Sequence, residues 1–422
     1  MKSTRAFLSF CIKNIIIIGG SILIGFLLLV LAYSLPINPI MKNVDASVET
    51  VNYISSHMTD PDTGKSLDIY TDSIMMEEAE YESELSAIKK AAFSYYNLIP
   101  YFPAQISFVN IHTGTVSCID METESYARYW HGYLIFLKPA LTFFTYEQIR
   151  ILNLVLQTSL LAVLLVLIWS KIRESIFPFL ITVMLMAPTT ISKCLQYSSV
   201  YYLMLISTII YLWNPKKLIN HRNIHYYFLV IGIICNYIDF LTAPMITLAF
   251  PLCFYVANEI KNGNTCTKDL LWSVLLSCAE WVAGYAFMWV GKWTIAYILK
   301  VDAILWTVKN AFLLRSSTEY TARIPTVISN FEYLLSNKYV SWFIVLWIAF
   351  FLAYNTVKKR IDWKHLILLF IPMIPAVWTF VMAEHSTVHL WMTFRNMAPA
   401  VMSVMLVSVP SKTRNQKELI QQ

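Results

Sequence analysis

Three acidic residues in the first long polar stretch of the sequence are candidates for a general base. Asp72 stands at the head of a predicted helix, and Asp120 and Glu124 precede an aromatic segment. A carboxylate that accepts a hydroxyl proton in a transition state typically contributes about 10²–10⁴-fold in rate. Asp72 is the first choice and the other two are its rivals. The structural alternatives are an N-cap for Asp72 and solvated loop positions for Asp120 and Glu124.

Four basic residues could together hold a phosphate group: His385, His389, Arg395 and Lys292. The two histidines are four residues apart, so on a helix they share one face. Arg395 could hold phosphate oxygens by two-point contact, or it could extend its charge to lipid headgroups. The segment His-Ser-Thr-Val-His lacks the glutamate of a zinc-protease helix. A divalent cation held with Glu384 is an alternative for the same segment.

Further polar residues extend this candidate pocket. Arg128 and His131 lie in the aromatic segment, and Asp239 lies in a short polar break between two apolar runs. Asp239 and Lys292 could instead pair as buried structural charges. Glu280, halfway along an apolar run, could be a hydrogen-bonding group between two helices.

The composition requires a membrane setting for these residues. Of 422 residues, 57% are hydrophobic and 14% are charged, with a mean hydropathy of +0.55. Soluble domains carry about 45–50% apolar and about 25% charged residues, so a soluble enzyme is excluded. The net charge of +6 does not indicate a nucleic-acid partner, because membrane proteins use Lys and Arg to set their orientation. The seven cysteines are scattered without a CxxC, so neither a disulfide framework nor a zinc site is predicted.

Apolar runs predict an all-α polytopic membrane protein with about ten transmembrane helices, since a span needs about 20 apolar residues. The expected spans are 14–33, 149–169, 176–191, 196–213, 225–238, 242–257, 270–290, 339–356, 365–383 and 394–409.

The basic residues predict the orientation of these spans. With the N-terminus inside, six short segments on the cytoplasmic side hold 17 basic and five acidic residues, as the positive-inside rule requires. Both termini are then cytoplasmic in a multi-pass cell-membrane protein. The absence of an Asn-x-Ser/Thr sequon favours a bacterial plasma membrane.

The spans divide the chain into five regions. A cytoplasmic tail and first span are followed by a large outer loop, spans two to seven, a second outer loop, and the last three spans with a cytoplasmic tail. Their ranges are 1–33, 34–148, 149–290, 291–338 and 339–422.

The first outer loop is expected to hold three helices, at 45–57, 73–96 and 124–143. The last is amphipathic and rich in Tyr and Trp, as is typical of a helix at the membrane surface. The acidic run from Glu77 to Glu84 suits the start of a helix, and we interpret it as a solvated face.

This layout resembles the GT-C superfamily of membrane glycosyltransferases. In that family an outer loop after the first span carries an essential acidic residue at the head of a juxtamembrane helix, and a second such helix leads to the second span. The segment 71–76, with Asp72, is similar to the first position, although the usual Asp-Glu pair is here Asp72-Ser73. The segments 126–139 and 144–153 are similar to the second helix and to the entry of the second span. His385 to Arg395 is similar to a late outer loop of bacterial members.

The resemblance implies transfer of a sugar from a polyprenyl-phosphate donor to a glycan, lipid or polymer acceptor on the outer face. Asp72 would act as the base in an inverting displacement, and membrane lipids would surround the protein. Two alternatives stay open. A polysaccharide polymerase or ligase would use basic residues of the second outer loop, such as Arg315 and Arg323. A lipid or solute transporter would place its charges at mid-membrane and carry sequence repeats.

Overall fold

The computed structural model describes residues 2–115, 121–215, 223–262, 265–317, 320–358 and 363–409. Most of these residues are helical. Among them, the strands are β1 (Tyr95–Leu98) and β2 (Glu122–Ser125), which pair antiparallel with Tyr95 opposite Ser125.

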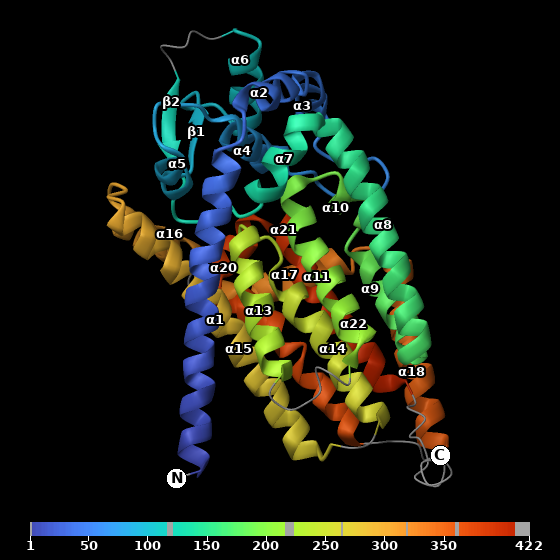
Figure 1. The fold of residues 1–422 in the computed structure, drawn as a ribbon. Coiled ribbons are helices and arrows are strands. Elements are labelled where there is room, and N and C mark those ends of the chain that lie inside the picture. Colours follow the sequence, from blue (N-terminus) through green and yellow to red (C-terminus); the bar gives the residue numbers. More distant parts are fainter. Residues whose placement is uncertain are drawn as a thin grey trace.

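Seven helical segments are long and apolar enough to cross a membrane, which confirms the prediction of an all-α membrane protein (Figure 1). They are Leu8–Tyr33 within α1 (Lys2–Tyr33), α8 (Tyr146–Lys171), α11 (Leu195–Trp213), α15 (Thr267–Ile298), α18 (Lys338–Val357), Lys364–Val381 across η3 (Trp363–Phe370) and α19 (Met373–Val381), and Leu390–Ser408 across α21 (Leu390–Thr393), η4 (Phe394–Met397) and α22 (Ala398–Ser408).

Three predicted spans correspond to helices outside this set. The segment 176–191 is divided into α9 (Ile176–Leu185) and α10 (Pro188–Ser192), because Ala187 has a left-handed backbone (φ 58°) just before Pro188. The segments 225–238 and 242–257 are α13 (Asn223–Ile238) and α14 (Met245–Asn262). The number of ten therefore stays a prediction.

Two glycines bring α13 and α15 into close contact. A Cβ at Gly232 would lie 2.1 Å from the carbonyl oxygen of Trp281, and one at Gly284 would lie 2.3 Å from that of Leu229. Small residues at such positions let helix backbones approach closely. Glu280 of α15 accepts hydrogen bonds from the side-chain amide of Asn14 in α1, at 2.8 and 2.9 Å. These contacts agree with its predicted role as a hydrogen-bonding group between two helices.

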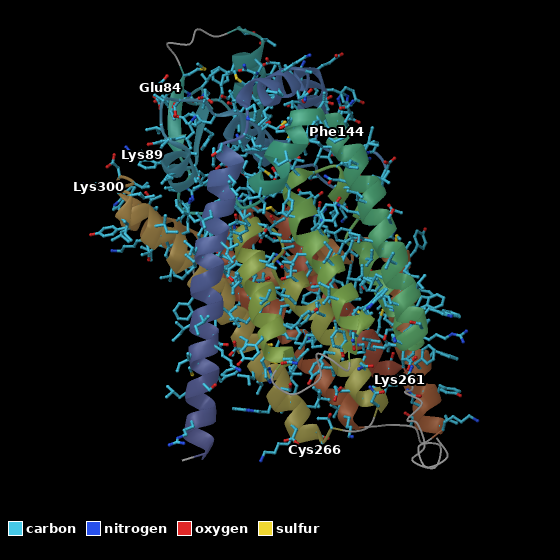
Figure 2. All side chains as sticks on the ribbon, in the orientation of Figure 1. Glu84, Lys89, Phe144, Lys261, Cys266 and Lys300 are labelled. Carbon is cyan, nitrogen blue, oxygen red and sulfur yellow. The ribbon has the colours of Figure 1, made fainter. Side chains whose placement is uncertain are left out.

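The described residues within 34–133 form a compact region, which we call the head, at one end of the long helices (Figure 1). Its elements are α2 (Ile37–Asp45), α3 (Val48–Ser56), α4 (Ile69–Glu80), α5 (Ala87–Phe93), α6 (Ala104–His112) and the two strands, and α7 (Leu134–Phe143) leads from it into α8. Glu84 and Lys89 lie at the head end, whereas Lys261 and Cys266 lie at the opposite end (Figure 2).

Two helices predicted in the head differ from the helices in the structure. The single helix over 73–96 is wrong: α4 ends at Glu80, and α5 begins after Ser86, whose side chain accepts a hydrogen bond from the Lys89 amide. The helix over 124–143 is also wrong in its first half. Residues up to Ser125 belong to β2, and His131 has a positive φ of 55°, so the helix begins only at Leu134.

The part of the acidic run that lies in α4 is buried, which contradicts its interpretation as a solvated face, whereas Glu82 and Glu84 after the helix are exposed. Glu77, Glu78 and Glu80 are 3%, 0% and 8% exposed. The helix α4 runs through the middle of the head and contacts α2, α3, α6 and α7. Buried carboxylates need partners, and the residues beside these three, His112 of α6 and His131 and Tyr133 before α7, are distant in sequence.

Of the remaining helices in the described residues, one follows α8 and the others come after α15. They are η2 (Arg173–Ser175), α16 (Ile304–Ser316), α17 (Tyr320–Leu334) and α20 (Ala383–Val388). The helix α16 projects from the bundle below the head (Figure 1) and exposes Leu305, Trp306 and Leu314.

Candidate functional site

A cavity of about 590 Å³ lies between the head and the long helices. Ligand pockets typically enclose about 300–1,000 Å³, so this cavity has room for a sugar phosphate. Its polar and aromatic lining comes from both parts of the chain: Ser66, Asp68, Tyr70, Thr71, Gln105 and Tyr126 from the head, and Gln196, Phe240, Arg315, His385, His389 and Trp391 from the rest.

Asp68 is the carboxylate of this cavity. It is the N-cap of α4, a position that favours Asp, and it accepts hydrogen bonds from the Thr71 amide (3.1 Å) and hydroxyl (3.0 Å). The side chain lines the cavity although the residue is only 5% exposed. Burial raises the pKa of Asp68, and the hydrogen bonds from Thr71 oppose this shift in part. A raised pKa suits a proton acceptor.

A cation and two imidazoles line another part of the cavity. Arg315 of α16 donates from Nη1 to Nδ1 of His385 at 2.9 Å, and Nε2 of His385 lies 3.0 Å from the carbonyl oxygen of Leu241. Because arginine can only donate, Nδ1 of His385 is the acceptor, and Nε2 carries the proton. The rings of His385 and His389 lie 4.7 Å apart.

Both histidines are neutral at pH 7 in this arrangement. Burial, with the charge of Arg315 beside it, holds the pKa of His385 well below its usual range. The same two causes lower the pKa of His389 to about 4. The two histidines predicted to bind phosphate therefore carry no positive charge. The cation beside them that lines the cavity is Arg315.

Asp72, the predicted base, does not line the cavity. Its carboxyl group is fully buried and accepts hydrogen bonds from the Tyr146 hydroxyl (2.6 Å), the Leu195 amide (2.9 Å) and the Gln196 amide (3.1 Å). Burial raises the pKa of Asp72 to about 7. These contacts join α4 of the head to the N-terminus of α11, so Asp72 holds the wall of the cavity in position.

Glu124, one of the two rivals of Asp72, is not part of the cavity lining. Glu124 lies on exposed strand β2, where it accepts a hydrogen bond from the Tyr96 hydroxyl at 3.0 Å. Asp120 lies outside the described residues.

The other two residues predicted to bind phosphate lie outside the lining. Lys292 is fully buried, and its Nζ donates to the Ala91 and Ala92 carbonyls at the end of α5. Arg395 is 1% exposed and donates to the carbonyls of Met186 and Trp391, while its Nη2 has no hydrogen-bond partner. Arg395 still acts on the cavity through its charge, which lowers the pKa of Asp68 against the dominant effect of burial.

The three predicted pocket residues have supporting positions. Arg128 stacks on the Tyr126 ring (4.2 Å to its centre) and lines a small neighbouring pocket shared with Arg315. His131 lies between Glu78 (2.8 Å) and the Tyr126 carbonyl (2.8 Å).

Asp239 lies in the loop between α13 and α14 and accepts a hydrogen bond within it. Its Oδ1 accepts from the Thr242 amide at 3.0 Å, and burial raises its pKa to about 6. Asp239 is buried beside Phe240, which lines the cavity. It has no ion pair with Lys292, so the predicted pairing of these two residues is wrong.

Sequence reasoning missed Asp68 and ranked Arg315 only as an alternative. Asp68 and Asp72 are one helical turn apart, and an aspartate immediately before an apolar helix start is an N-cap signal. That signal would have placed the helix start at Ile69 and drawn attention to Asp68. No local signal brings Arg315 to His385, since the two are 70 residues apart.

No family model matches this sequence, and neither a curated protein nor a solved structure matches it.

Proposed function

We propose that this protein is an integral membrane glycosyltransferase that moves a sugar from a polyprenyl-phosphate donor to a glycan, lipid or polymer acceptor. The observation that carries the proposal is the cavity at the junction of head and bundle, which contains one buried carboxylate, Asp68, and the guanidinium of Arg315. The resemblance to GT-C enzymes, which use such donors and carry an essential acidic residue at the head of a juxtamembrane helix, supports the same reaction.

The reaction would use Asp68 as the base. The acceptor hydroxyl gives its proton to the Asp68 carboxylate as its oxygen bonds to the anomeric carbon of the sugar. The bond between that carbon and the phosphate oxygen breaks, and polyprenyl phosphate leaves with the bonding electron pair. A displacement of this kind inverts the anomeric centre.

Arg315 would bind the donor phosphate. Its planar guanidinium suits two-point contact with phosphate oxygens, and it would offset the charge that develops on the leaving group. The neutral His385 accepts one N–H of this guanidinium and so fixes its orientation. Trp391, which lies 5.2 Å from the His389 ring and lines the cavity, offers an apolar surface to the sugar ring.

The head would face the outside of the cell, with both termini in the cytoplasm. This orientation follows the distribution of basic residues and suits lipid-linked donors. Two exposed positions test it: Glu84→Cys, at the head, should react with an impermeant thiol reagent added outside, and native Cys266, at the other end, should not (Figure 2). In a background with Cys118→Ser, outside labelling of Cys266 would contradict the orientation.

A strain that lacks the protein tests the function. We expect one polyprenyl-phosphate sugar to accumulate in its membranes and one sugar substituent to disappear from an envelope glycan or lipid, because donor is made but not consumed. Mass spectrometry of lipid extracts and released glycans from this strain and its parent measures both changes. Reintroduction of the parental gene should reverse them, whereas an Asp68→Asn gene should not. Unchanged donors and glycans would contradict the proposal, and donor trapped on the cytoplasmic side would favour a flippase.

A further inference from the structure

A second group of chemically competent side chains lies in the head, away from the cavity. Glu77 and Glu80 are one turn apart on α4, and His112 is the last residue of α6. One ligand atom from each of these residues lies within 4.8 Å of the others. The cavity is lined by the first halves of the same two helices, from Asp68 to Ile74 and at Gln105, so the group belongs to a separate place.

The two carboxylates of this group are not fully satisfied by protein contacts. Nε2 of His112 forms ion-pair contacts at 2.8 Å with one oxygen of Glu80 and at 3.5 Å with one oxygen of Glu77. Oε1 of Glu77 and Oε2 of Glu80 are buried and accept no hydrogen bond. Buried polar atoms are normally satisfied, and here two carboxylate oxygens without a hydrogen bond belong to one group.

Asp45 holds the other side of the imidazole. Its carboxylate accepts from Nδ1 of His112 at 2.7 Å. A histidine that ligates a metal typically donates its second ring N–H to a carboxylate in this way, which fixes the ring and leaves the opposite nitrogen free for the metal. The contact thus presents Nε2 of His112, as an acceptor, toward Glu77 and Glu80.

We propose that Glu77, Glu80 and His112 bind a divalent transition-metal ion, with zinc as the first choice. One imidazole nitrogen and two carboxylate oxygens are a ligand set suited to zinc, whereas magnesium and calcium prefer oxygen ligands alone. Charge supports a cation at this point, because three carboxylates (Asp45, Glu77 and Glu80) surround one imidazole. The charge of Lys138 also acts on Glu80.

The ion would join α4 to α6 behind the cavity. Asp68 and Gln105, which line the cavity, stand at the starts of the same two helices. A metal at the far ends of these helices would therefore hold the wall of the cavity in place without contact with a substrate.

Metal content and thermal stability test the site directly. The full-length protein, purified in detergent, is stripped with a chelator, dialysed and then titrated with zinc chloride. We expect about one zinc per chain by elemental analysis and a rise of several degrees in Tm, since a ligand that binds only the folded state stabilises it. Glu80→Gln and His112→Ala should lose both, and the matched exposed variant His57→Ala should keep both.

Two outcomes would overturn the proposal. The first is a parental protein that holds less than about one-tenth zinc per chain and shows no shift in Tm. The group would then be an imidazolium held by carboxylates, in line with the raised pKa of His112, to which Glu77 and Glu80 contribute against burial. The second is zinc binding that Glu80→Gln and His112→Ala leave unchanged. Because the first result is measured on the parental protein, the test stands even if a variant fails to fold.

Discussion

Asp68→Asn should lower the turnover of sugar transfer by at least about 100-fold, because a positioned general base typically contributes about 10²–10⁴-fold. The substitution removes the proton acceptor and should leave the fold intact. Asn and Asp are equally good N-caps, and the amide oxygen can still accept from the Thr71 amide. Turnover is measured as polyprenyl phosphate released from the labelled donor by protein in lipid nanodiscs, with Tm recorded on the same sample.

The pH profile separates a base from a merely structural residue. Burial raises the pKa of Asp68 above its usual value, and only the ionised form can accept the proton. Transfer should therefore fall as the pH drops through this raised pKa, at a higher pH than for an ordinary aspartate, whose pKa is about 3.9. The residual activity of Asp68→Asn should lack this acidic limb. A variant with near-parental turnover would remove Asp68 from the chemistry.

Asp72→Ala should destabilise the protein by about 3–5 kcal/mol. It leaves the Tyr146 hydroxyl and the Leu195 and Gln196 amides without their acceptor, and each buried donor left unsatisfied costs about 1–3 kcal/mol. The head would lose the two hydrogen bonds that Asp72 accepts from the start of α11. Thermal unfolding in detergent measures this loss.

Glu84→Ala is the matched control for this substitution, because it removes an exposed carboxylate from the head and should leave Tm unchanged. Parental stability of Asp72→Ala together with lost transfer would make Asp72, and not Asp68, the catalytic base.

The long helices were predictable because each apolar run stops at polar residues that are visible in the sequence. The run 196–213 differs by one residue from α11, and 339–356 differs by one residue at each end from α18. Where helices are short and buried, such as α9, hydropathy alone misplaces them. A proline after a left-handed residue decides the break there.

The head was less predictable because its contacts are long-range. Glu77 and Glu80 look like a solvated face in sequence, and only the distant His112 explains their burial. His385 and His389 were correctly brought together with a cation, but that cation is Arg315. Asp68 and Asp72 are one helical turn apart, so the choice of the candidate base depends on the residue at which α4 begins.

The central claim is that the polyprenyl-phosphate donor binds in the cavity, and photolabelling tests this claim most directly. A photoreactive polyprenyl phosphate is irradiated with the protein in nanodiscs, and labelled peptides are mapped by mass spectrometry. We predict labelling of the peptides that hold Tyr70 and Trp391, at least tenfold weaker in Arg315→Ala and unchanged in Arg173→Ala. Arg173 is exposed and follows Lys171, whose carbonyl accepts from Lys261 at the end of the bundle opposite the head (Figure 2). Labelling that avoids these peptides, or that Arg315→Ala leaves at the parental level, would contradict the account.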